Sequence, residues 1–124
     1  MLILLDSNVI ISGLMSYDTP PARLLRSWVR DEIFELVTSE AQIAELARAL
    51  GYDRVRARVR EEQARNVLEN MSAYAVIATA LPTLDVSPDP HDNVILATAV
   101  AGGADLIVSG DRAGMLDLDQ VSRS

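Results

Sequence analysis

Two aspartates directly follow runs of buried-strand character near opposite ends of the chain. Leu2-Ile3-Leu4-Leu5 leads into Asp6, and Asp105-Leu106-Ile107-Val108 leads through Ser109-Gly110 into Asp111. Strand ends in an open parallel sheet converge on one crevice, so two neighbouring strands of this kind would bring both carboxylates to the same edge. The natural occupant of such a pocket is a divalent cation, because hard ions prefer carboxylate oxygens.

Two further acidic residues, Glu45 and Asp92, lie where helices are predicted. Two carboxylates about 4 Å apart repel by roughly 4 kcal/mol at an effective dielectric constant of about 20, so four converging acids need a cation between them. In phosphodiester hydrolysis, one or two magnesium or manganese ions activate a water, neutralise the transition state and stabilise the departing oxygen. The acidic set therefore predicts metal-assisted cleavage of a phosphodiester.

Each acidic residue also has an ordinary structural interpretation. Asp6 could cap a helix or form a turn, but an ionisable group that ends a buried strand has no packing reason to be there, which favours function. Asp111 could belong to a Gly-Asp turn, and function is again favoured. Asp92 sits where a helix begins and would make a good N-cap, so capping and chemistry are equally supported. Glu45 lies away from the apolar stripe of its helix, which fits a cleft-lining residue and a solvated glutamate equally well.

Polar neighbours add weaker candidates. Asn8 could orient Asp6 or hold a metal-bound water, and Ser109 could contact phosphate or water, although both also suit turns. His91, the single histidine, lies in a predicted loop, where a histidine is more often without a chemical role.

The overall composition indicates one soluble domain. A chain of 124 residues with 49% hydrophobic content is large enough for a single core. Cysteine is absent, which excludes disulfides and thiolate metal sites, disfavours structural zinc and fits a reducing cytoplasm. No apolar stretch resembles a signal peptide or a membrane span, so we expect a cytoplasmic protein.

The net charge of −7, taken alone, argues against a nucleic-acid partner because polyphosphate would be repelled. The distribution of charge changes that expectation. All eleven basic residues are arginine, and five of them lie between positions 54 and 65. A bound metal would also offset the acidic pocket. The arginine segment is more often a solvated helix face, with a favourable pair from Glu61 to Arg65, than an RNA contact.

Strands alternate with helices along the chain. Strands are predicted at residues 2–5, 34–38 and 104–108, and further extended segments at 74–77 and 83–86. Helices are predicted from the Asp18-Thr19-Pro20-Pro21 start, from a capping box at Ser39 to Gln42 that ends at Gly51, over 53–71, and over 93–101 before Gly102-Gly103. This alternation predicts βαβ crossovers and a parallel sheet.

Four segments in order resemble the PIN domain family. They are Leu-Leu-Asp-Ser-Asn-Val-Ile at 4–10, Ile-Ala-Glu-Leu-Ala-Arg-Ala-Leu at 43–50, Asp-Pro-His-Asp-Asn at 89–93 and Ala-Asp-Leu-Ile-Val-Ser-Gly-Asp at 104–111. The resemblance covers about residues 1–116 and is greatest to the toxin components of toxin–antitoxin pairs, relatives of VapC-like ribonucleases.

The resemblance implies a three-layer α/β/α sandwich with a central parallel sheet, which cleaves single-stranded RNA with Mg²⁺ or Mn²⁺. By motif position, Asp6, Glu45, Asp92 and Asp111 correspond to the family's acidic quartet, with Asn8 and Ser109 as polar neighbours. A homodimer and a cognate antitoxin protein are also implied.

Two departures from the family pattern are present. Members often carry another acid two or three positions after the last aspartate, where this chain has Ala113 and Gly114, so a second metal would be poorly held. Members usually also continue through a closing strand after the position where this sequence ends, which leads us to expect a shortened C-terminal end to the single domain of residues 1–124.

Three other classes of protein are less well supported. Receiver and haloacid-dehalogenase-like phosphotransfer domains need a lysine, which this chain lacks, and a dinucleotide-binding domain needs a glycine-rich first turn. The remaining alternative is a PIN-like module that binds RNA or protein without cleavage. The full acidic quartet argues against it, because a domain that does not cut has no need for repelling carboxylates.

Overall fold

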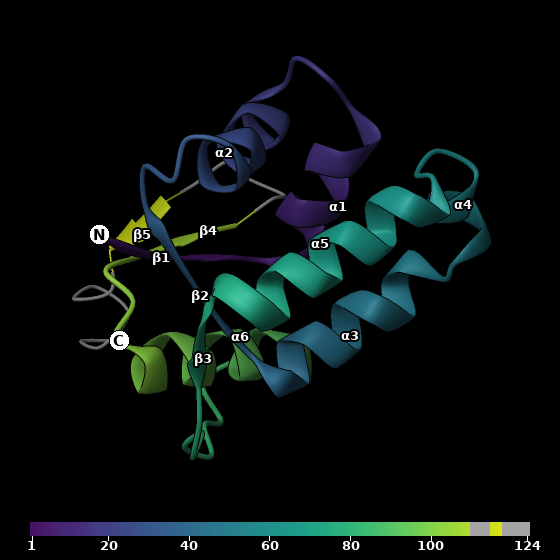
Figure 1. The fold of residues 1–124 in the computed structure, drawn as a ribbon. Helices are drawn as coiled ribbons and strands as arrows, with labels where there is room; N and C mark the ends of the chain where they lie inside the picture. The colour runs from purple at the N-terminus through teal and green to yellow at the C-terminus, as the bar shows by residue number, and fades with distance from the viewer. Residues whose placement is uncertain (110–114, 118–124) are drawn as a thin grey trace.

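The computed structural model describes residues 1–109 and 115–117, which contain a five-stranded sheet with helices on both faces (Figure 1). The sheet has the order β3-β2-β1-β4-β5. The first four strands are parallel, and β5 is antiparallel to β4. The strands are β1 (Leu2–Leu5), β2 (Glu35–Ser39), β3 (Val76–Ala78), β4 (Leu106–Val108) and β5 (Met115–Asp117). The predicted α/β sandwich with a central parallel sheet is confirmed.

The two faces of the sheet pack against different helices, as the alternation of side chains along a strand requires. Ile3, Leu5 and Leu36 face a large core shared with α1, α2, α3 and α5, whereas Leu4, Val37 and Ile107 face α6. The helices are α1 (Ser7–Met15), α2 (Pro20–Val29), α3 (Glu40–Leu50), α4 (Asp53–Arg56), α5 (Glu61–Tyr74) and α6 (Pro90–Gly102). Helix α1 is not predicted from the sequence, because Ser7 and Asn8 are typical turn residues, but in the structure they begin a helix that Asp6 caps.

The strands that precede Asp6 and Asp111 are neighbours. Leu5 of β1 is paired with Val108 of β4, and the backbone N–H of Asp6 donates to the carbonyl of Val108 at 3.0 Å. The two strands are therefore adjacent, as an acidic crevice shared by their ends requires. Asp111 itself lies outside the described residues.

Gln42 fixes the start of α3 to the ends of two strands. The Ser39 hydroxyl accepts a hydrogen bond from the Gln42 backbone N–H at 3.2 Å, so the predicted cap is present. The predicted reciprocal bond is not formed. Instead the Gln42 side chain donates to the carbonyl of Leu5 and accepts from the Thr38 hydroxyl, each at 2.7 Å, in a fully buried position. The amide thus ties α3 to the sheet edge where Asp6 lies.

The single helix predicted over residues 53–71 is wrong. It is divided into α4 and α5, and the backbone N–H of Arg60 before α5 donates to the side chain of Gln63 at 3.0 Å. No glycine or proline marks this break in the sequence. Val55 and Val59 are both buried on either side of the end of α4, so tertiary packing of these residues, rather than a local signal, accounts for the division.

The extended segments predicted near residues 74–86 are partly correct. One becomes β3, after which Ala80 adopts a left-handed backbone with φ of 54°. The other, residues 83–86, forms no strand, because the backbone N–H groups of Val86 and Ser87 donate to the side chain of Asn93 instead.

Helix α6 begins earlier than predicted. Asp89 is its N-cap and accepts from the backbone N–H of His91 at 3.0 Å, with Pro90 as the first helical residue. Asp92 is therefore inside the first turn, so of the two interpretations left open for it, capping is wrong. Proline is preorganised for the first helical position, which explains the earlier start. Gly102 is the last helical residue and Gly103 follows it in the left-handed conformation, so the helix ends at the predicted pair of glycines.

Across the described part of the chain, none of the helices has both the length and the apolar character needed to cross a bilayer.

We predict that Gln42→Met destabilises the protein by about 2–4 kcal/mol, because two buried polar groups lose their partner at nearly constant side-chain volume. The free energy of unfolding in urea measures this change. Arg48→Met, at an exposed position of the same helix, is the matched control and should change the free energy of unfolding by less than about 0.5 kcal/mol. Equal stability of the two variants would contradict the role given to Gln42.

Candidate active site

Asp6 combines a structural role with an available carboxylate. It directly follows β1, and its Oδ1 accepts from the backbone N–H of Asn8 at 3.4 Å as the N-cap of α1. Its side chain is only 13% exposed, and among the described residues no arginine pairs with it. A buried carboxylate without a permanent cationic partner is costly, so Asp6 needs a compensating group.

His91 supplies that group from the first turn of α6. Its Nε2 donates to Asp6 Oδ1 at 3.0 Å. On the other side of the ring, Nδ1 forms an ion-pair contact with Glu45 Oε1, although the angles are not those of a hydrogen bond. The imidazole ring therefore bridges two carboxylates that come from different elements.

Glu45 reaches the site from the middle of α3. From the helical wheel, the side chain of Glu45 suits a cleft and a solvated surface equally well. The structure places this side chain beside His91, with 30% of it exposed. The attachment of α3 to the end of β1 through Gln42 puts this helix next to Asp6. Asp6 and Glu45, two members of the predicted quartet, are thus brought to one place.

Asp92 lies beside this pair rather than within it. Its side chain is exposed, and Oδ2 accepts a hydrogen bond from the Ser87 hydroxyl at 3.1 Å. In the described structure no hydrogen bond or ion pair joins it to Asp6 or Glu45. Asp92 follows His91 directly in α6, so it stands at the border of the site.

The other predicted residues surround the same edge. Asn8 is exposed in the first turn of α1, and Ser109 is half-buried directly after β4. Asp111, the fourth member of the quartet, lies outside the described residues.

The electrostatics of the site centre on His91. Partial burial lowers the pKa of the imidazole, but the hydrogen bond to Asp6 and the negative charges of Asp6 and Glu45 outweigh burial and raise the pKa above the ordinary value of 6.5. The protonated ring is a cation between two anions, hydrogen-bonded to Asp6 through Nε2 and in ion-pair contact with Glu45 through Nδ1. The ring thus offsets the repulsion between the carboxylates, which the sequence predicts a metal ion to offset.

The donor atoms suit a hard divalent cation. Carboxylate oxygens of Asp6 and Glu45 are the ligand type that Mg²⁺ and Mn²⁺ prefer. Ser7 Oγ, in the residue next to Asp6, is buried and has no hydrogen-bond partner in the part of the chain that the structure describes. Within the same residues, no three His, Asp or Glu side chains are arranged to hold one ion. The carboxylate oxygens therefore suit a divalent cation, but in this structure the His91 ring lies between the two carboxylates.

The sequence matches the PIN domain family over residues 2–113. The chain belongs to the PIN domain family. Proteins of this family are generally nucleases that use divalent metal ions, so a nuclease-type function follows for this chain. No match was found among curated proteins or among solved structures.

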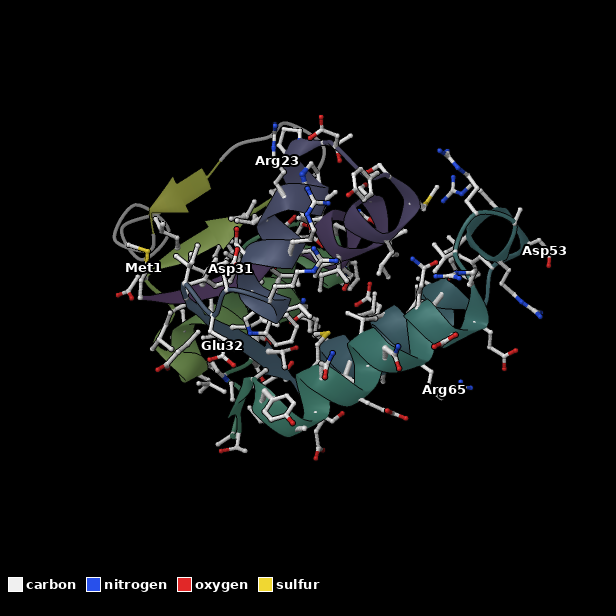
Figure 2. The ribbon with its side chains drawn as sticks, turned by 45° about the horizontal axis from the view of Figure 1, so that its top comes forward. Met1, Arg23, Asp31, Glu32, Asp53 and Arg65 are labelled. Atoms are coloured by element: carbon white, nitrogen blue, oxygen red, sulfur yellow. The ribbon has the colours of Figure 1, made fainter. Side chains whose placement is uncertain are left out.

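In this PIN domain, the arginines between residues 54 and 65 lie apart from Asp31 and Glu32, the two acidic residues of the loop between α2 and β2. All five arginines between residues 54 and 65 are exposed, and the expected pair from Glu61 to Arg65 is not formed. Among the described residues, the one ion pair between an arginine and a carboxylate joins Arg23 to Asp18 at 3.7 Å. Figure 2 shows Arg65 on the opposite side of the molecule from Asp31 and Glu32. The arginines are therefore available to a polyanion.

His91 has a larger role in the site than its place in the sequence indicates. A single histidine in an apparent loop carries no helical pattern, and its contact with Asp6 spans 85 residues of sequence. The Asp-Pro pair at positions 89–90 was the signal that could have placed His91 in a helix rather than in a loop.

We predict that His91 makes the metal-free PIN domain less stable as pH rises. Because its pKa is higher in the folded state than 6.5, its stabilisation is complete below 6.5 and is lost as pH rises through the folded pKa. With a chelator present, the free energy of unfolding should fall more between about pH 6 and about pH 8 in the wild type than in His91→Gln. If the free energy of unfolding changed with pH equally in both proteins, the two carboxylates would not stabilise the protonated imidazole.

Proposed function

We propose that this PIN domain is an endoribonuclease that hydrolyses phosphodiester bonds of single-stranded RNA with Mg²⁺ or Mn²⁺. One observation carries the proposal: Asp6 and Glu45, which belong to different elements, converge on His91 at the carboxyl edge of the sheet. The end of β4, from which the chain leads toward Asp111, is hydrogen-bonded to the same edge. A structural role alone gives no reason to collect repelling carboxylates there.

Asp6 and Glu45, with Asp92 and Asp111, would hold the ion. When bound, the ion supplies activation of water and neutralisation of the charge that develops on phosphate. The residues of the chain itself hold the metal-binding groups in position. The backbone bond from Asp6 to Val108 and the Gln42 bond to Leu5 hold Asp6 and α3 in a fixed relation before substrate arrives.

His91 balances the carboxylates in the absence of an ion. Its ring contacts one oxygen of each, so an ion that binds both oxygens has to displace these contacts. His91 is therefore proposed as a competitor of the ion rather than as a ligand. Asn8 and Ser109 are polar groups at the same edge that can orient phosphate or water.

The exposed arginines support an RNA substrate in an otherwise acidic chain. Contacts of arginine with phosphate do not depend on sequence, and they would counter the long-range repulsion from the net charge of −7. The resemblance of the motifs to VapC-like ribonucleases supports a cytoplasmic toxin of a toxin–antitoxin pair, with a cognate antitoxin protein and a homodimeric state as further parts of the proposal.

We expect the purified protein to cleave single-stranded RNA in the presence of Mn²⁺ and Asp6→Asn to be slower by at least about a hundredfold, since even residues that only support metal ligands cost up to that much. Asparagine still caps α1, so the fold should be retained. Asp53→Asn, an exposed aspartate at the start of α4, is the control that should leave cleavage unchanged. The amount of shortened RNA that appears with time on a denaturing gel measures the rate.

Two results would speak against this proposal. Cleavage that persists with a chelator and in Asp6→Asn would refute a metal-dependent reaction at this site. RNA binding without cleavage in the wild type would favour the module that binds RNA or protein without cutting.

We further predict opposite effects of two substitutions on Mn²⁺ affinity, measured by calorimetry without RNA. Glu45→Gln should weaken binding by about tenfold or more because it removes an oxygen charge from the site. His91→Ala should strengthen binding, because the ion no longer competes with the imidazole. Weaker binding in His91→Ala would identify His91 as a ligand instead.

A further inference from the structure

A groove lies between α5 and the pair of helices α1 and α2, which run beside one another (Figure 1). It has a volume of about 550 Å³ and is lined by residues of the three helices and of the loop between α1 and α2. The two helices form one firm wall, because a Cβ at Gly13 would lie only 2.9 Å from the carbonyl oxygen of Pro21. None of the described lining residues belongs to the candidate active site.

The charged side chains of the groove are all arginines, although the chain carries a net charge of −7. They are Arg26, Arg30 and Arg60, and no aspartate or glutamate of the described residues lines the groove. Arg30 and Arg60 are exposed, and neither pairs with a carboxylate in the part of the chain that the structure describes. Asp18, in the loop between α1 and α2, pairs with Arg23 outside the groove. The groove is thus a positive region of an acidic protein and favours an anionic ligand.

The uncharged polar groups of the groove suit the bases of a single strand. Gln63, Asn66 and Asn70 are spaced by three and four residues, so their amides lie in a row on one face of α5. An amide can both donate to and accept from the edge of a base. Tyr17 is 81% exposed, and the Arg26 guanidinium lies 5.1 Å from the centre of its ring. An exposed aromatic ring beside an arginine is a platform on which a base can stack.

The groove offers little apolar surface to an amphipathic helix of a protein partner. Ala22, Leu25 and Val67 line it, but each of these side chains is 8% exposed or less. Val29 is 47% exposed and lies at one end. A helix that docks in a groove needs a stripe of apolar contacts along its length, whereas a nucleic acid needs cations and stacking surfaces. The lining therefore favours a nucleic acid over an acidic helix.

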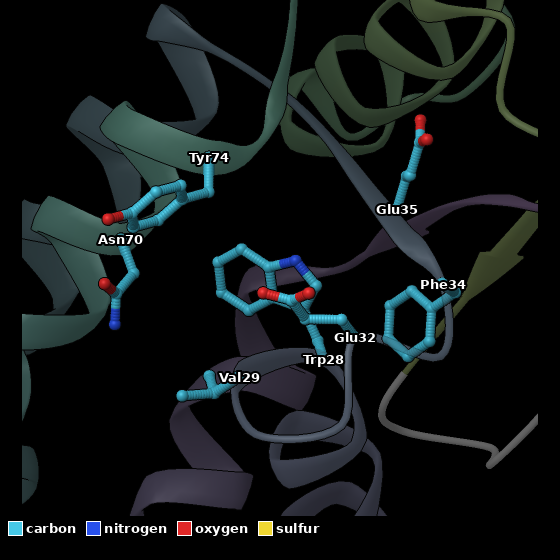
Figure 3. A pocket seen from close by; sticks show the side chains of 7 residues that line it. All are labelled: Trp28, Val29, Glu32, Phe34, Glu35, Asn70 and Tyr74. Carbon is cyan, nitrogen blue, oxygen red and sulfur yellow. The ribbon is translucent and has the colours of Figure 1, made fainter.

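The two ends of the groove differ in charge. At one end, Val29 and Asn70 also border a neighbouring hollow, which Figure 3 shows from close by. Glu32 lines that hollow, so negative charge begins beyond this end. At the other end, Gly13 belongs to the helix that Asp6 caps, and the seven residues between them correspond to about 10 Å along the axis of α1. This distance is short enough for one strand of a few nucleotides to occupy both the groove and the acidic site.

We propose that this groove binds single-stranded RNA next to the site of cleavage. The arginines contact phosphates, the amides of α5 contact base edges, and Tyr17 stacks on a base. The proposal rests on the proposed function for the identity of the substrate. It adds where the strand lies on the protein and which residues hold it. A single strand is required, because the bases of a duplex are already stacked and paired.

The fluorescence anisotropy of a labelled uridine decanucleotide measures this binding directly. The titration uses the full chain with a chelator, so that no metal-dependent cleavage takes place. Arg30→Gln and Arg60→Gln should each weaken binding by about threefold or more at a salt concentration of about 50 mM, and each should reduce the slope of log affinity against log salt by about 0.7. Arg23→Gln removes the same charge from an exposed position of α2 outside the groove and should leave this slope unchanged.

Two further pairs of variants test the uncharged groups. Tyr17→Ala should weaken binding by about fivefold or more, whereas Tyr52→Ala, at another exposed tyrosine outside the groove, should bind as the wild type does. Asn66→Ala should weaken binding by about two- to fivefold without a change in the salt slope. Ser72→Ala, at an exposed position of α5 outside the groove, is its control and should have no effect.

The outcomes separate this proposal from the proposed function. Unchanged RNA affinity in Arg30→Gln, Arg60→Gln and Tyr17→Ala would overturn the groove and leave the nuclease untouched, and so would a wild type that cleaves RNA but does not bind the decanucleotide. Weaker binding in these variants, together with a wild type that does not cleave RNA with Mn²⁺, would support the groove and reject the nuclease. A glutamate decapeptide that displaces the RNA with equal affinity would assign the groove to an acidic protein segment instead.

Discussion

Asp6 is the residue on which the arrangement of the site depends, because three interactions meet there. Its backbone N–H joins β1 to β4, its carboxylate caps α1, and the same carboxylate contacts His91. The first two interactions fix the backbone, so the carboxylate remains at the sheet edge whether or not the histidine is beside it. A charged group held in this way cannot move to bulk water to relieve its burial, and a cation therefore has to come to it.

The backbone features that form the site could largely be predicted from the sequence. The apolar run before Asp6 and the apolar run of β4 indicated buried parallel strands, and Ser39 indicated the start of α3. These signals are local, since they arise from strand burial and helix capping. They do not specify which side chains meet. The approach of Glu45 to the site depends on the buried bonds of Gln42, and no local pattern reveals such bonds.

The errors had a common physical origin. The start of α1 looked like a turn because capping residues and turn residues are of the same types. The division between α4 and α5 was missed because Val55 and Val59 are spaced as in one continuous helix. His91 was placed in a loop because the start of α6 was set too late, at Asp92 rather than at Pro90. In each case tertiary context selected between two structures that the same residues permit.

The edge of the sheet formed by β3 has a consequence for the behaviour of the protein at high concentration. An exposed edge strand offers unpaired backbone groups to other molecules, and a long flat edge promotes aggregation. Here β3 is only three residues long, and Ala80, two residues beyond it, turns the chain away with a positive φ. The short, abruptly terminated edge gives a neighbouring molecule little backbone to extend, so the sheet is protected from growth by strand addition on this side.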